Sequence, residues 1–249
     1  MKKIFVLLLI LLLGIFAFTG CDGTIIPTEG EGEGEGEGEG EVTQVVLVEA
    51  FIADGCPSCA VVKPHLEKLA GEYGRDEMIL VEVVPWGLYS VPESKDRYDW
   101  YSVFSGVPQV LFNGLATRLS GTQDYDALKS RITAQLNATP TISIQATRTT
   151  TEGVTIISGS IKNISDSALS NLAINGMAFR NRGSGFRYAV VDIFEEEKVN
   201  ISSLDSDESY SFSFNLGDIN WDGYNLDGVI FVQSVNHPQK VIRQSLFIN

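Results

Sequence analysis

The sequence predicts an α/β domain, residues 43–138, followed by an all-β sandwich, residues 139–249. Up to Pro140, apolar runs of strand formers alternate with segments whose apolar residues recur at helical spacing. After Pro140 come about seven short segments rich in Ile, Val, Phe, Ser and Thr, separated by turn residues and without a convincing helix. The first pattern is typical of a sheet covered by helices, and the second of two packed antiparallel sheets.

Residues 1–20 have the pattern of a secretory signal peptide. Lys2 and Lys3 precede an apolar run, residues 4–18, and small residues then lead to Cys21. The alternative is a transmembrane anchor, but the run is shorter than the ~20 residues that a spanning helix needs. The segment resembles a bacterial lipobox, although Phe18 stands where leucine is usual. This resemblance implies lipidation at Cys21, and hence a chain tethered to a membrane of the bacterial cell envelope, outside the cytoplasm.

Residues 21–42 are predicted to form a lipid anchor and a disordered linker. Glu29 to Glu41 is a strict alternation of Glu and Gly, which buries no apolar surface and repels itself. Seven of the 32 acidic residues lie in this repeat, so much of the formal net charge of −14 belongs to the linker. The sequence contains no basic patch of the kind that would indicate nucleic-acid binding.

The motif that indicates chemistry is Cys56-Pro57-Ser58-Cys59. It lies between an apolar run of strand formers, residues 45–52, and a segment with helical apolar spacing, residues 61–72. A helix amino end offers unsatisfied N–H groups and the positive end of the helix dipole, both of which stabilise a thiolate. We therefore expect Cys56 to be the nucleophile and Cys59, one turn later, to be the resolving thiol.

With this motif the chain resembles the thioredoxin-like superfamily of thiol:disulfide oxidoreductases, over roughly residues 43–137. The resemblance rests on the order strand, C-x-x-C and helix, on Pro64 five residues after Cys59, and on Pro108. Pro108 matches the cis-proline that lies against the disulfide in that family, so the resemblance implies a catalytic role for it. A trans proline at a strand start is the alternative.

The same resemblance implies three substrate contacts. A cis peptide bond before Pro108 would expose the backbone of Val107 for strand-like pairing with a client protein. Pro57 and Ser58, between the two cysteines, would contact the client and tune the redox potential.

Further elements complete the predicted α/β domain. Residues 78–84 read as a second buried parallel strand, and a helix is expected from about residue 94 to 104. Asn113-Gly114 predicts a hairpin with residues 115–119, and Asp124 caps a last helix. Aromatic residues between the second strand and this hairpin would line a client groove beside the disulfide or, alternatively, pack in the core: Trp86, Tyr89, Tyr98, Trp100 and Tyr101.

Glu49 is the one acidic residue in the first apolar strand and a candidate proton relay. Many relatives in the superfamily keep a buried carboxylate near the active site. Glu49 lies seven residues before Cys56, where the family pattern has its acid six before. Its side chain therefore faces the cysteines only if a bulge resets the strand.

The second half is predicted to be an immunoglobulin-like sandwich. Asn175-Gly176 is one of the turn signals between its strands. The order of the two domains resembles a group of bacterial outer-membrane-type lipoproteins. The predicted strands cover residues 141–147, 154–162, 172–180, 188–194, 209–216, 229–235 and 241–248.

No metal or cofactor is expected. One of the three cysteines is assigned to lipid and two to the redox pair. A zinc site on this pair would need two further ligands, and His65 and His237 lie in different predicted domains. The segment that begins at Asp218 opens like a calcium loop, but Val229 stands where the loop needs glutamate, which favours a turn.

These observations predict an extracytoplasmic, membrane-tethered thiol-disulfide oxidoreductase. Its partners would be client proteins with thiols or disulfides and a further redox protein that recharges it. The alternative is a non-catalytic binding or assembly lipoprotein of the cell envelope in which the bond between Cys56 and Cys59 is structural.

Overall fold

The computed structural model describes residues 42–249 except residue 103. The predicted signal peptide, the lipidation site Cys21 and the Glu-Gly linker lie outside the described residues. The described residues belong to one compact unit. Among them, no helix has both the length and the apolar character that crossing a membrane requires.

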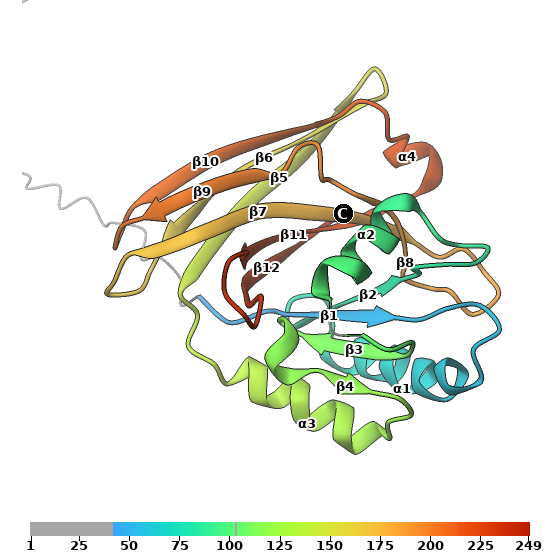
Figure 1. The fold of residues 1–249 in the computed structure, drawn as a ribbon. Coiled ribbons are helices and arrows are strands. Elements are labelled where there is room, and N and C mark those ends of the chain that lie inside the picture. Colours follow the sequence, from blue (N-terminus) through green and yellow to red (C-terminus); the bar gives the residue numbers. More distant parts are fainter. Residues whose placement is uncertain (1–41, 103) are drawn as a thin grey trace, which may run out of the picture. The chain divides into compact units, whose positions relative to one another are not determined.

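The first part of this unit alternates strands and helices (Figure 1). Strands β1 and β2 are buried at every position and pair in parallel, as predicted. Asp124 caps α3 by accepting a hydrogen bond from Ala127 N at 2.8 Å, which confirms the predicted cap. The elements are β1 (Val46–Phe51), α1 (Pro57–Tyr73), β2 (Met78–Val83), α2 (Pro92–Tyr101), β3 (Gln109–Phe112), a 3-10 turn (Leu115–Thr117), β4 (Leu119–Ser120) and α3 (Tyr125–Leu136).

The second part is almost entirely strand. The seven predicted strands all form, and β9 and the one-turn helix α4 add to them. The Asn175-Gly176 pair is not a turn, because both residues lie in the middle of β7. The elements are β5 (Ile142–Thr151), β6 (Val154–Asn163), β7 (Leu169–Arg180), β8 (Ala189–Ile193), β9 (Val199–Leu204), β10 (Ser209–Leu216), α4 (Trp221–Tyr224), β11 (Asp227–Ser234) and β12 (Ile242–Ile248).

The described strands form two sheets. The large sheet has nine strands in the order β12-β11-β7-β8-β2-β1-β3-β4, with β9 paired to β7. The small sheet has three strands in the order β10-β6-β5. The link between the two halves of the chain is β8, which pairs with β7 on one side and in parallel with β2 on the other, through Glu82 and Ala189.

This topology corrects the predicted fold class. An α/β thioredoxin-like domain followed by a separate immunoglobulin-like sandwich is wrong, because one sheet runs through residues on both sides of position 138. The described chain is mostly β, with twelve strands and only four α-helices. The physical reason is the long-range pairing of β2 with β8, which no local sequence pattern reveals.

Three hydrophobic clusters hold the layers together. Helices α1 and α3 pack against one face of β1, β2 and β3, through the alternate side chains of β1 that begin with Val46. The opposite face, which begins with Leu47, packs against the Tyr101 end of α2 and against β7, β8 and β11. The third cluster fills the space between the small sheet and the other face of β7 and β11.

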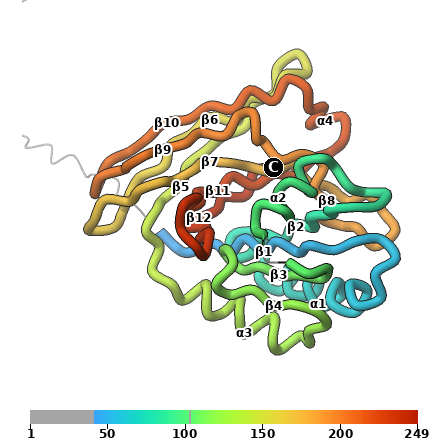
Figure 2. The backbone as a smooth tube through the Cα atoms, in the orientation of Figure 1, coloured from blue at the N-terminus to red at the C-terminus, as the bar shows by residue number. Residues whose placement is uncertain are grey.

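The Asn113-Gly114 pair joins the two halves instead of making a tight hairpin. Strand β3 does pair with β4, but through only two residue pairs and after the intervening 3-10 turn. Leu115 N donates to Gln239 O at 2.9 Å, and Ile242 N donates to Asn113 O at 3.0 Å. A Cβ atom on Gly114 would lie 2.6 Å from Lys240 O, so only glycine allows this approach. Figure 2 shows the β11–β12 turn beside this end of β3.

Candidate functional site around Cys56 and Cys59

Cys56 lies at the amino end of α1, in the position that caps the helix. The chain leaves β1 after Phe51 and turns at Gly55, whose φ is +67°. Pro57 occupies the first helical turn, where its missing N–H costs no hydrogen bond. The sulfur of Cys56 accepts a hydrogen bond from Cys59 N at 3.2 Å. An N–H group of the first turn therefore points at this sulfur, as the motif predicts.

The two cysteines form a disulfide and differ in exposure. Their Cα atoms are 5.3 Å apart. Cys56 is half-buried, whereas Cys59 is 1 % exposed and packs with Val62 and Leu66 beneath the helix. A sulfur atom of another molecule can therefore approach the bond at Cys56 and not at Cys59. Pro57 is exposed and Ser58 half-buried, so both lie at the surface beside the reachable sulfur.

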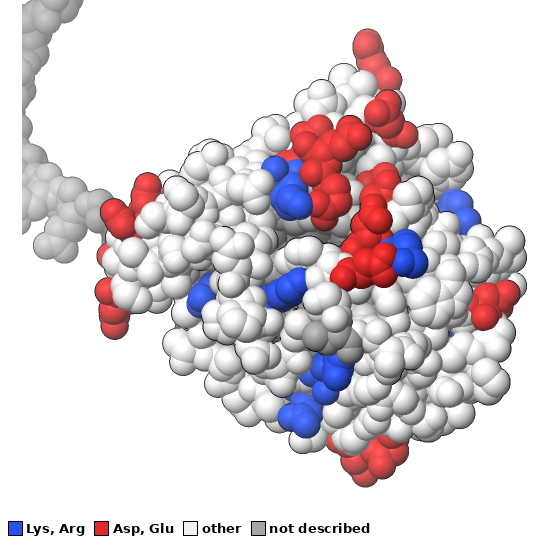
Figure 3. Space-filling view, viewed as in Figure 1, with Lys and Arg blue, Asp and Glu red and all other residues white. Residues whose placement is uncertain are grey.

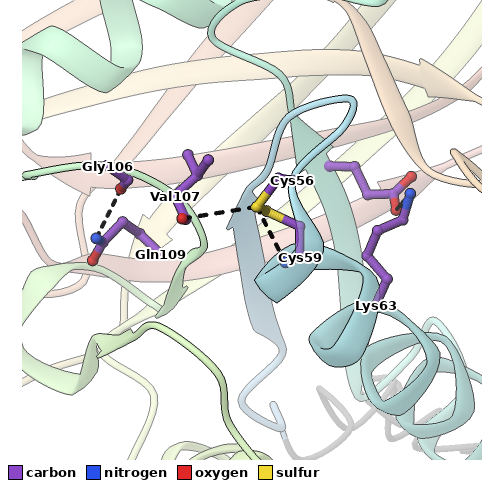
Figure 4. The surroundings of a disulfide bond; sticks show 7 residues. Cys56, Cys59, Lys63, Gly106, Val107 and Gln109 are labelled. Atoms are coloured by element: carbon purple, nitrogen blue, oxygen red, sulfur yellow. Dashed lines mark hydrogen bonds and ion pairs between the residues drawn. A yellow bond between two sulfur atoms is a disulfide. The ribbon is translucent and has the colours of Figure 1, made fainter.

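The peptide bond between Val107 and Pro108 is cis, as the sequence predicts. Val107 O lies 3.9 Å from Cys56 Sγ (Figure 4). Gln109 Nε2 donates to Gly106 O at 2.9 Å and holds the segment in this position. The structure thus brings together six of the predicted site residues: Cys56, Cys59, Val107, Pro108 and, at the surface, Pro57 and Ser58.

Glu49 lies away from the disulfide, on the opposite face of the sheet. Strand β1 has no bulge before Cys56, so Val48 and Ala50 face α1 and Glu49 faces the other way. Its carboxylate is fully buried, accepts from Arg97 Nε at 2.5 Å and from the Tyr101 hydroxyl at 2.7 Å. The arrangement is a buried ion pair between β1 and α2, which joins the layers and does not reach the sulfur atoms.

Glu82 is the buried acid on the same face of the sheet as α1. It lies in β2 between Leu80 and Val84, which both pack in the cluster under this helix. Its carboxylate accepts from Tyr188 N at 2.9 Å and lies 3.8 Å from Lys63 Nζ. Burial raises the pKa of Glu82 to about 7, although the Tyr188 N–H and the Lys63 ammonium favour the charged form. Near neutral pH this carboxyl group is thus divided between its two protonation states.

Lys63 of α1 is the cation that lies beside this acid. It follows Cys59 by four residues, so the two side chains lie on the same side of the helix. Figure 4 shows Lys63 on this side, next to the turn that carries the cysteines. Its side chain is only 12 % exposed, and its ammonium group lies 3.6 Å from the centre of the Phe186 ring.

The sequence prediction missed both Glu82 and Lys63. The signal was present in the apolar strand Met78–Val83, where Glu82 is the one charged residue. Both faces of a buried parallel strand are covered, so a single acid in such a strand is buried. Because side chains alternate between the two faces, the position of the acid in the strand shows which face it lies on.

The predicted aromatic cluster divides between core and surface. Tyr101 is fully buried, and Tyr98 packs edge-on against Phe51 with 5.9 Å between the ring centres. Trp86 is 41 % exposed and leans on Tyr98. Gly87 lies next to Asp54, two residues before Cys56, so this segment borders the loop that carries the disulfide.

Comparisons with known proteins identify the fold and no family. No protein-family model matches the chain, and no curated protein sequence does. HBP35 of Porphyromonas gingivalis has a similar structure, with a TM-score of 0.64 and 16 % identity over 82 % of this chain and 74 % of that one. A protein from Agrobacterium tumefaciens matches with a TM-score of 0.56 and 14 % identity, over 82 % of this chain and 94 % of that one.

These two likenesses cover both halves of the chain together. The assignment to the thioredoxin-like superfamily with a separate immunoglobulin-like domain is therefore wrong, because the architecture is mostly β and the structures similar to it over 82 % of the chain include HBP35 and the Agrobacterium tumefaciens protein. At 14–16 % identity, the likeness establishes the fold alone.

Proposed function

We propose that the protein exchanges disulfides with client proteins through the bond between Cys56 and Cys59. The observation that carries the proposal is the asymmetry of the two sulfur atoms. One is reachable and caps a helix, and the other is buried behind it. A purely structural bond has no need of this asymmetry, whereas thiol–disulfide exchange needs one sulfur that is attacked and one that leaves.

In the oxidised protein, the exchange begins at the bond between Cys56 and Cys59. A client thiolate attacks Cys56 Sγ, a bond forms between these two sulfur atoms, and the bond to Cys59 breaks. Cys59 leaves with the electron pair and takes up a proton. A second client thiolate then attacks the client sulfur of the mixed disulfide and releases the Cys56 thiolate. The client has lost two electrons and the cysteine pair has gained two; the reverse sequence reduces a client.

Cys56 is the nucleophile in the reduced protein. Its sulfur accepts the N–H of Cys59 and lies at the positive end of the 17-residue helix α1. Both effects favour the thiolate, which is the reactive form. Cys59 is surrounded by apolar side chains, which favour its neutral thiol.

In this proposal Glu82 is the proton donor on the inner side. When Cys59 leaves as a thiolate, a proton must reach a buried sulfur. Glu82 lies on the sheet face that α1 covers, and because burial raises its pKa to about 7, part of the population holds a proton at neutral pH. Lys63, whose ammonium group is 3.8 Å from this carboxylate, is a positioning residue.

The amino-terminal segment supports a location outside the cytoplasm. The proposal places the chain on a membrane of the bacterial cell envelope, tethered through lipid on Cys21, where disulfides persist. Incorporation of a radioactive fatty acid into the wild-type chain, and its loss in Cys21→Ser, is the expected result. Equal labelling of both proteins, or none in either, would refute the lipid anchor.

Disulfide exchange is tested by reduction of insulin with dithiothreitol and by reactivation of scrambled ribonuclease. We expect turnover by the wild type, none above background by Cys56→Ser, and a long-lived mixed disulfide with Cys59→Ser. Cys21→Ser is the matched cysteine control and should keep full turnover. Equal rates for the wild type and Cys56→Ser would indicate the structural disulfide of the alternative interpretation.

A further inference from the structure

A cavity of about 530 Å³ lies between α2 and the large sheet, and neither Cys56 nor Cys59 lines it. Its walls come from α2, β7, β9 and β11 and from the segment that follows β8. Volumes of ~300–1,000 Å³ are usual for sites that enclose a small molecule. On the face drawn in Figure 3, acidic side chains gather around a hollow over α2.

The cavity exists because α2 covers only part of this face of the sheet. Further along β7, Met177 and Phe179 point to the same side and fill the core beneath α2. Towards the start of the strand, the positions of the same face are Asn175 and Ala173, which are polar or small. Gln233 of β11 pairs with Ala173 and continues this polar surface.

Three polar side chains of the cavity are at least nine-tenths buried. The exposed fractions are 6 % for Arg97, 3 % for Asn175 and 3 % for Gln233. Buried polar groups are normally satisfied, and these are satisfied only in part. Arg97 uses Nε for Glu49 and Nη2 for Tyr101 and Gln233, and among the described residues no hydrogen bond of its Nη1 is found.

The two amides keep hydrogen-bonding capacity as well. Asn175 Nδ2 donates one bond, to Glu195 Oε1 at 2.8 Å, and has a second N–H. Gln233 Oε1 accepts from Arg97 at 3.4 Å and has a second lone pair. The floor of the cavity thus offers both donors and acceptors at fixed positions.

This floor carries no unmatched charge. The Arg97 guanidinium is neutralised by Glu49, and Lys198 is hydrogen-bonded to the carboxylate of Glu195. A charged ligand group brought to the floor would lose its water without meeting a free opposite charge, which is costly. At the rim, the carboxylates of Glu93 and Asp96 disfavour an anion further.

Trp100 adds one flat apolar wall. It is 36 % exposed, and Lys240 holds it through a hydrogen bond to its carbonyl group and a contact with its ring, 3.7 Å from the ring centre. An indole face beside fixed amides suits a ligand with an apolar face and a hydroxylated edge.

We propose that this cavity binds an uncharged, hydroxyl-rich small molecule, a neutral saccharide of one or two rings. The C–H face of the sugar packs on Trp100, and its hydroxyl groups exchange hydrogen bonds with Arg97 Nη1, Asn175 and Gln233. The site is independent of the disulfide and of the exchange proposed for it.

The test is a titration of the full chain, in detergent, by saturation-transfer NMR and calorimetry. The probes are neutral monosaccharides and disaccharides (glucose, galactose, mannose, xylose, maltose and cellobiose). Glucuronate shares the ring of glucose but carries a negative charge. At least one neutral sugar should bind at millimolar concentration, and glucuronate should bind more weakly than glucose or not at all.

Two tryptophan variants complete the test. Trp100→Ala should weaken binding about tenfold, because the stacking wall is lost. Trp86→Ala, which removes a similarly exposed indole outside the cavity, should bind like the wild type. No binding by any neutral sugar, tighter binding of glucuronate than of glucose, or equal affinity of Trp100→Ala and the wild type would each overturn the proposal.

Discussion

Replacement of Glu82 by glutamine should change how the stability of the protein depends on pH. The carboxyl group is 2 % exposed, and burial raises its pKa from 4.5 to about 7. Between these two pH values the unfolded chain has released the proton and the folded chain still holds it. The free energy of unfolding of the wild type therefore falls as pH rises through this window, and it levels off above pH 7.

The size of the effect follows from the same shift. A tenfold change in proton affinity is worth about 1.4 kcal/mol, so the contribution of Glu82 changes by about 3 kcal/mol between pH 4 and pH 8. Glu82→Gln has no proton to release. The difference in unfolding free energy, wild type minus variant, should thus fall by about this amount over the window.

The assay is urea denaturation of the oxidised proteins at a series of pH values. Glu77→Gln is the matched control, because Glu77 is exposed and directly precedes the same strand. Its difference from the wild type measures the removal of one surface carboxylate. A difference between wild type and Glu82→Gln that stays constant from pH 4 to pH 8 would refute the assigned environment of Glu82.

Two further predictions concern the packing. Arg97→Met should lower the unfolding free energy by about 3–5 kcal/mol, since it leaves the Glu49 carboxylate buried without its cation; the double variant with Glu49→Leu should recover most of the loss, and additive losses in denaturation experiments would contradict the pairing. Gly159→Ala should destabilise by roughly 1–3 kcal/mol, because its Cβ would lie 2.1 Å from Gln145 O of β5. Gly71→Ala, in α1 with no atom near its Cβ, should instead stabilise by roughly 0.5–1 kcal/mol, and thermal unfolding that ranks these two variants the other way would contradict the structure.

Local features were predictable from the sequence because their causes are local. The C-x-x-C motif follows an apolar strand and opens an amphipathic segment, which is enough to place Cys56 at a helix amino end. The cap at Asp124 also depends on residues close in sequence, whereas the cis bond at Pro108 was predicted from the family resemblance and not from a local cause. The predicted strands were also found in the structure, because short runs of apolar, β-branched residues indicate buried strands and are local features of the sequence.

Features set by distant parts of the chain were not predictable. The pairing of β2 with β8 through Glu82 and Ala189 decides that the two halves share a sheet, and nothing near either residue signals it. Asn175-Gly176 has the composition of a turn but lies in a strand. Gly176 is needed there because a Cβ would come within 2.5 Å of Phe194 and 2.8 Å of Ile230. Local preference yields to packing at such positions.

The central claim is that Cys56 is an activated thiol and Cys59 is not. The most direct measurement is alkylation of the reduced protein by iodoacetamide over a series of pH values, with each modified cysteine identified by mass spectrometry. We predict that at neutral pH Cys56 reacts at least about ten times faster than Cys59, because only its sulfur is both reachable and held by a helix N–H group. Equal, slow modification of both residues, or faster modification of Cys59, would contradict the account.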